Sequence, residues 1–375
     1  MNGEGFARAL RSLEALEPRP GAPERTLDLA GARLRLRFGS PRLAELCMRA
    51  LAHHEVASSS VARCDLTIDV VDRDTPGNPL SALPAALVDG RPDGGERVER
   101  WSYEGAAGRA LLQEGYRVLY LWHRALGRAA VCFDDASAPP YYQIALPLLP
   151  LLGWVFAERG LAILHAAAIE IGGGAVLFGG RSGTGKSTTA LACLDAGLGY
   201  LGDDLCLVEP GEPPMVHSLY CSAKLDPADT HRFPALAPAL ASPVSRAPMQ
   251  EDSTRGAASA AASDVTSKVV YLFDRHLADR VVRRAPLLGV AIPRRGPDGP
   301  PLALSPGRAF LAMAPNTVFL LPGAARAAAA GVKALVTRVP VHVVAVGDSI
   351  ADIVPRVREH ARYLGSRSRR GDDAA

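Results

Sequence analysis

The stretch Gly180-Arg181-Ser182-Gly183-Thr184-Gly185-Lys186-Ser187 decides the fold of this 375-residue chain, because it fits the pattern G-x-x-x-x-G-K-[ST] of a phosphate-binding loop. An apolar run, Ala175–Phe178, precedes it and favours a β-strand. A run with apolar residues at helical spacing, Thr188–Leu194, follows it, and Gly197 is placed as a C-terminal stop. Strand, glycine-rich loop and helix in this order predict an α/β domain that holds phosphate at the start of a helix.

The side chains of this loop indicate a site for ATP and Mg²⁺. Lys186 is placed to reach the β- and γ-phosphates, and the Ser187 hydroxyl can bind Mg²⁺. A glycine-rich surface turn is the alternative interpretation of the motif. We expect the nucleotide to be bound by Gly180, Arg181, Ser182, Gly183, Thr184, Gly185, Lys186, Ser187 and Thr188.

An acidic pair, Asp203 and Asp204, follows the loop between two strand-like pieces, 199–201 and 205–208. Adjacent carboxylates at a strand junction point in different directions. We therefore expect Asp203 to join Ser187 in binding Mg²⁺ while a carboxylate of the pair faces the acceptor hydroxyl as general base. Which aspartate is the base stays open, and a surface turn is the alternative.

Three further residues are candidates. His165 opens the strand expected before the loop strand, where it is either catalytic or a structural histidine. Lys224 contacts a phosphate or a peptide substrate, or else is a solvated lysine. Asp274 ends the apolar run Val269–Phe273, which has the shape of a strand that delivers a metal-binding aspartate and so competes with the acidic pair for that role.

The remaining sequence predicts a second, smaller domain before the loop domain. Alternating apolar and polar residues in the N-terminal part favour strands around one helix near 41–52. Two apolar runs joined by three glycines, 161–171 and 175–178, predict a β-hairpin that leads into the loop. The predicted organisation is a flexible N-terminus at 1–25, an α+β domain at 26–138, a catalytic domain at 139–365 with a mobile insertion at 233–264, and a disordered tail at 366–375.

Composition excludes several classes of function. The net charge of +3 is too small to indicate binding to nucleic acid or to an anionic membrane. The six cysteines are scattered without a C-x-x-C pair, which fits a reducing cytoplasm. The most apolar stretch, 144–157, contains two prolines and is too short to span a bilayer.

Several motifs together resemble the catalytic domain of HPr kinase/phosphorylase. They are Leu164–Ala168, the phosphate loop with Thr188 after it, and Gly202–Asp204. The runs 218–225 and 339–347 are similar to the HPr-kinase-like proteins of bacterial peptide-biosynthesis clusters, such as lasso-peptide precursor kinases. The resemblance implies a P-loop fold shared with PEP carboxykinases, with a mixed sheet and a hairpin before the loop. It also implies ATP and Mg²⁺ as cofactors, an aspartate of the acidic pair as base, and oligomeric relatives.

These patterns favour a cytoplasmic kinase that transfers the γ-phosphoryl group of ATP to a serine of a protein or a ribosomal peptide. Two other functions stay open. One is a kinase for a small metabolite, and the other is a nucleotide-dependent binding or assembly protein with ATPase activity.

Overall fold

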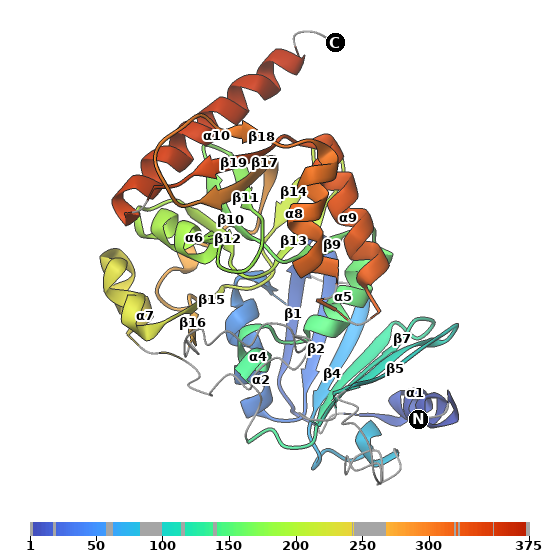
Figure 1. The fold of residues 1–375 in the computed structure, drawn as a ribbon. Helices are drawn as coiled ribbons and strands as arrows, with labels where there is room; N and C mark the ends of the chain where they lie inside the picture. Colours follow the sequence, from blue (N-terminus) through green and yellow to red (C-terminus); the bar gives the residue numbers. More distant parts are fainter. Residues whose placement is uncertain are drawn as a thin grey trace, which may run out of the picture. The chain divides into compact units, whose positions relative to one another are not determined.

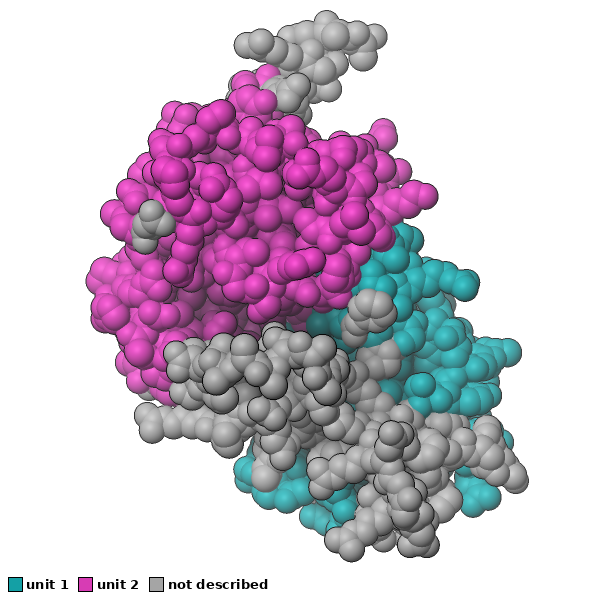
Figure 2. Space-filling view, in the orientation of Figure 1, with its two compact units in different colours: residues 1–163, 317–331 teal, residues 164–316, 332–375 magenta. Residues whose placement is uncertain are grey.

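The structure is a computed structural model. It describes residues 3–17, 20–57, 63–82, 100–113, 117–137, 141–241, 243, 268–318, 320–321, 323–347 and 349–372. The chain divides into two compact units, coloured separately in Figure 2: unit 1 comprises 1–163 and 317–331, and unit 2 comprises 164–316 and 332–375. The division differs from the predicted boundary at residue 139, because residues 141–163 and the later segment 317–331 cluster with unit 1.

Unit 1 contains an eight-stranded mixed sheet in the order β3-β1-β2-β4-β8-β7-β6-β5 (Figure 1). The three central strands β2, β4 and β8 are parallel, and the pairs outside them are antiparallel. Alternate side chains of β2 are fully buried, as its alternating sequence predicts. The strands are β1 Glu24–Leu29, β2 Ala32–Phe38, β3 Glu55–Val56, β4 Leu66–Val71, β5 Arg100–Gly105, β6 Gly108–Gln113, β7 Val118–His123 and β8 Arg128–Phe133.

The predicted flexible N-terminus is wrong for most of its length, because helix α1 spans Gly3–Ala15. Ala9, Leu10 and Leu13 recur on one face of this helix and are buried against apolar side chains of β6, β7 and β8. The apolar spacing of a short amphipathic helix is present in the sequence, but only the sheet supplies the surface that it covers. The other helices of unit 1 within 1–163 are α2 Pro41–Leu51, α4 Tyr141–Ala145 and α5 Leu149–Glu158.

Leu13→Ala is expected to destabilise unit 1 by about 2–4 kcal/mol, since it opens a cavity where the leucine is fully buried. Urea denaturation followed by tryptophan fluorescence measures this, because all three tryptophans, Trp101, Trp122 and Trp154, belong to unit 1. Leu126→Ala, at a side chain that is 41% exposed, is the matched control and should change little. An unchanged urea midpoint for Leu13→Ala would show that α1 does not cover the sheet.

Unit 2 has a mixed sheet in which β12, β10, β11, β17, β14 and β13 are successive neighbours. Strands β10 and β11 are antiparallel, with Ile171 opposite Gly174 at the turn, and β11 runs parallel to β17. The long strand β17 pairs with β14 through its first residues and with β19 through its last ones. Two further strands, β15 and β16, form a separate antiparallel pair.

Helices α6 and α10 cover one side of this sheet (Figure 1) and bury a continuous apolar cluster against it. The strands are β10 Ala167–Ile171, β11 Gly174–Phe178, β12 Gly199–Gly202, β13 Cys206–Glu209, β14 Met215–His217, β15 Ser222–Leu225, β16 Val269–Leu272, β17 Arg284–Arg294, β18 Leu302–Ala303 and β19 Val341–Ala345. Strand β9, Ala162–Leu164, begins in unit 1. The α-helices described after residue 163 are α6 Lys186–Asp195, α7 Ala237–Leu240, α8 Pro306–Val318, α9 Ala325–Arg338 and α10 Ile350–Asp372. The end of α8 and the first half of α9 belong to unit 1.

Two predicted irregular segments are ordered where the structure describes them. The first residues of the predicted insertion at 233–264 pack into the core of unit 2, because Phe233 and Leu236 are fully buried and α7 follows them. Residue 242 and residues 244–264 lie outside the described residues. Residues 366–372 of the predicted tail continue α10, whose apolar face is anchored earlier by Val357 and Leu364. Arginine favours helix, so a polar composition alone did not indicate disorder here.

Candidate functional site

The glycine-rich loop lies between the end of β11 and the start of α6. Gly180, Gly183 and Gly185 have φ values of 112°, 83° and 98°, a conformation that side chains with a Cβ atom rarely adopt. No side chain caps the N-terminus of α6, so the positive end of this helix remains for an anion. The Lys186 ammonium donates hydrogen bonds to the carbonyl oxygens of Gly180 and Arg181, both at 3.0 Å. The loop is thus folded around its own lysine.

Burial lowers the pKa of Lys186, against the opposing effect of the negative charges of Asp203 and Asp204. The acidic pair therefore lies within electrostatic reach of the loop lysine. The Lys186 ammonium donates these hydrogen bonds to backbone carbonyl oxygens, which carry no full charge. A phosphate that enters the loop would stabilise this buried ammonium, because the phosphate brings a negative charge.

Asp203 follows β12 directly and is 2% exposed. Burial and the neighbouring charge of Asp204 raise the pKa of Asp203, while the nearby Ser187 hydroxyl and the backbone N–H groups of Lys224 and Asp204 act to lower it. Its Oδ1 atom has no hydrogen-bond partner within the described part of the chain. A buried carboxylate oxygen without a partner, beside a serine hydroxyl, fits the oxygen-ligand set of a magnesium ion.

Asp204 has different surroundings from its neighbour. Its Oδ1 lies 3.1 Å from His165 Nε2, and its Oδ2 accepts a hydrogen bond of 2.7 Å from the Lys224 ammonium. Burial by itself raises the pKa of Asp204, but the charge of Lys224 and the contact with His165 outweigh burial and hold the pKa far below its usual range. The backbone of Asp204 has φ of 71°, which is uncommon outside glycine and is tolerated best by Asp and Asn.

The two carboxylates thus differ in chemistry although they are adjacent in sequence. The negative charge of Asp203 has little compensation from its surroundings, so a bound cation would stabilise it. Asp204 is ionised and is held in one orientation by two partners. Neighbouring titratable groups whose pKa values are pushed apart in this way are typical of catalytic pairs that divide two roles.

The structure brings together six residues that the sequence singles out: Lys186, Ser187, Asp203, Asp204, His165 and Lys224. His165 lies in the short break between β9 and β10, where one continuous strand was expected. The competing aspartate, Asp274, follows β16, which pairs with β15 in a separate two-stranded sheet among the described residues.

Sequence reasoning missed several residues near the loop. The charge of Lys268 contributes to the lowered pKa of Lys186. Arg232 and Arg295 line a small pocket together with Thr184, Gly185 and Thr189 at the start of α6. The two arginines lie about 45 and 110 residues beyond the loop in sequence, without a motif of their own, so only the fold could place them.

Comparison with known proteins does not identify a family for this chain. No protein-family model and no curated protein matches the chain. Among solved structures, the chain matches the Hpr(Ser) kinase/phosphatase from Coxiella burnetii with a TM-score of 0.29 and 12% sequence identity, over 55% of this chain and 98% of that chain. A TM-score of this size does not establish a common fold. Among the described residues, no helix is long and apolar enough to cross a membrane.

Proposed function

We propose that this protein is an ATP-dependent kinase that transfers the γ-phosphoryl group to a serine hydroxyl of a protein or a ribosomal peptide. The observation that carries the proposal is the acidic pair beside the loop, in which buried Asp203 lies near the Ser187 hydroxyl and Asp204 accepts a hydrogen bond from Lys224. A site that only bound a nucleotide would not need a second carboxylate held in this way. The motif resemblance to HPr-kinase-like proteins supports the same reaction.

Each residue has a distinct part in this reaction. Lys186 leaves the loop carbonyls to contact the β- and γ-phosphates, and Ser187 with Asp203 would hold Mg²⁺. When bound, the metal ion neutralises charge on the phosphates. The serine oxygen forms a bond to the γ-phosphorus while the bond to the bridging oxygen of the departing ADP breaks, and Asp204 accepts the serine proton.

The depressed pKa of Asp204 makes it a weak base, so its contribution lies in position more than in proton affinity. In a loose phosphoryl-transfer transition state, the acceptor oxygen needs little prior deprotonation, and orientation dominates. His165 supports Asp204 as a positioning residue. Lys224 does the same through its ion pair with Asp204, and we propose that it also contacts the phosphate or the peptide substrate.

The direct test is transfer of labelled phosphate from ATP to a library of serine-containing peptides and proteins, with Mg²⁺ present and the product located by mass spectrometry. A phosphoserine product that disappears when the acceptor serine is replaced by alanine supports the proposal. Label that reaches only small alcohols or acids would show a metabolite kinase. ATP hydrolysis without any labelled acceptor would show a nucleotide-dependent assembly protein.

Asp203→Asn is expected to stabilise the metal-free protein and to weaken Mg²⁺ binding. A raised carboxyl pKa in the folded state means that the ionised form destabilises folding at neutral pH, so removing the charge relieves that cost. Thermal melts in EDTA should show a higher Tm, and Mg²⁺ titration with ATP present should require more metal. Asp279→Asn, at an exposed aspartate, is the matched control. A lower Tm and unchanged Mg²⁺ dependence would contradict the metal-binding role.

A further inference from the structure

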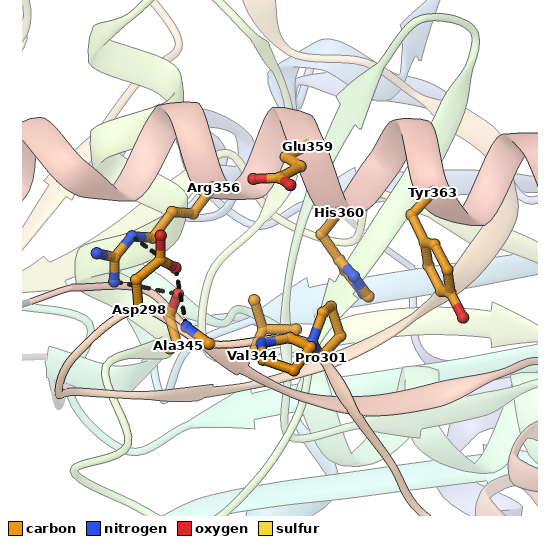
Figure 3. A pocket seen from close by; sticks show the side chains of 10 residues that line it. Asp298, Pro301, Val344, Ala345, Arg356, Glu359, His360 and Tyr363 are labelled. Carbon is orange, nitrogen blue, oxygen red and sulfur yellow. Dashed lines mark hydrogen bonds and ion pairs between the residues drawn. The ribbon is translucent and has the colours of Figure 1, made fainter.

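A separate pocket of about 450 Å³ lies beneath α10, where this helix crosses β19 and the segment before β18 (Figure 3). None of its lining residues belongs to the glycine-rich loop or to the acidic pair. Pro300, Pro301 and Val344 supply apolar surface. Polar and aromatic side chains from successive turns of α10 complete the lining: Arg356, Glu359, His360 and Tyr363.

His360 is a polar group of this pocket that the fold leaves unsatisfied. It is 2% exposed, and neither ring nitrogen has a hydrogen-bond partner among the described residues. Figure 3 shows its ring directed from α10 toward Pro301 and Val344. Burial, followed by the influence of His342, lowers the pKa of His360 to about 4, so the ring is neutral at pH 7 and offers a lone pair. Keeping such a group buried is costly unless something in the pocket binds it.

Three rings surround this side of the pocket. His342 of β19 stands edge-on to His360 and to Tyr363, with ring centroids 5.1 Å and 5.6 Å away. His360 and Tyr363 are nearly parallel, at 6.3 Å and an interplanar angle of 21°. Tyr363 is 41% exposed, so its ring is partly accessible from solvent. Ring faces of this kind attract cations.

The charged side chains at the pocket also favour a cation as the ligand. Arg356 lies 3.7 Å from Asp298, and its guanidinium also donates to the carbonyl oxygen of Ala345 at 3.4 Å. Arg356 and Asp298 therefore balance each other. Glu359 forms no ion pair within the described part of the chain, and its carboxylate is exposed at the pocket.

We propose that the pocket beneath α10 binds an alkylammonium group: Glu359 pairs with the cation, Tyr363 presents a ring face, His360 accepts a hydrogen bond, and the prolines contact the alkyl stem. This chemistry occurs both in free amines and in the lysine side chain of a peptide. The pocket is independent of the phosphate-transfer site, so the proposal does not depend on the kinase reaction.

Binding to the whole protein tests this, with n-butylammonium as the probe for a free amine and Nα-acetyl-lysine methylamide as the probe for a peptide lysine. Histidine-labelled protein is titrated at pH 7.5, and the His360 signal is assigned with His360→Asn. Saturable shifts of the His360 ring signals by either probe support the site. Tighter binding of the lysine probe identifies a peptide-borne ligand, and tighter binding of butylammonium a free amine.

Variants make the test specific. Glu359→Gln and Tyr363→Ala lie on exposed parts of α10, and each should weaken binding roughly two- to fivefold, as expected for a single exposed ion pair or cation–π contact. Glu45→Gln, an exposed glutamate in α2, is the matched control and should leave binding unchanged. Absence of saturable shifts with both probes, equal shifts with benzoate, or unweakened binding in both variants would overturn the proposal.

Discussion

Lys186→Ala is expected to reduce phosphoryl transfer by a factor of about 10²–10³ or more, because it removes the ammonium that would contact the β- and γ-phosphates. The folded chain should tolerate the change. The lysine contacts two loop carbonyls and has a pKa already lowered by burial, so its removal deletes a poorly solvated charge. Initial rates with labelled ATP measure the loss, and thermal melts measure the fold.

Lys333→Ala provides the control, since Lys333 is an exposed lysine on α9. It should keep full activity and the same Tm. If Lys186→Ala retained full transfer with an intact fold, the glycine-rich loop would not be the site of the nucleotide. Loss of activity together with a large loss of stability would instead point to a structural role for the lysine.

Asp204→Asn is expected to lower transfer by a factor of about 10²–10⁴, the range for removing a positioned acid–base group. Asparagine keeps the shape and tolerates the left-handed backbone conformation at φ 71°, so geometry is largely preserved. The amide cannot accept the serine proton. Steady-state rates of Asp204→Asn and of Asp279→Asn, an exposed matched change, separate the effect from a general one.

The effect of Asp204→Asn on stability is expected to depend on pH. The pKa of Asp204 is lowered in the folded state by Lys224 and His165, which outweigh the effect of burial, so its ionised form stabilises the fold at neutral pH. That contribution is lost as pH falls below about 5. The Tm difference between the unmodified chain and Asp204→Asn should therefore be largest near pH 7 and shrink in acid. A constant difference over this range would contradict the ion pair.

Much of the candidate site could be predicted from local sequence. The spacing of glycines before Lys186 and Ser187 requires a tight backbone turn, and the apolar runs around it indicate the strand and the helix that the structure has. Asp203 and Asp204 could be proposed because a pair of carboxylates interrupting an apolar region needs a reason. The N-terminal helix α1 could also have been found from its apolar spacing, but its polar flanking residues suggested a loose terminus.

Other features depend on distant parts of the chain. Sequence could not tell the two aspartates apart, since the pairing of Asp204 with Lys224 and His165 joins residues 20 and 39 positions away. Nor could it show that the strand before Asp274 belongs to a separate two-stranded sheet. The unsatisfied ring of His360 likewise exists only because β19 and α10 bury it together.

The sequence by itself determined the phosphate-loop motif, the residues that line it and the strand–loop–helix order, because backbone turns and helix starts depend on residues close along the chain. The tertiary structure alone decided the environment of each carboxylate, the packing of the chain's N-terminal helix and the pocket beneath α10. Those properties are set by burial and by charges from remote segments, and neither acts until the chain has folded.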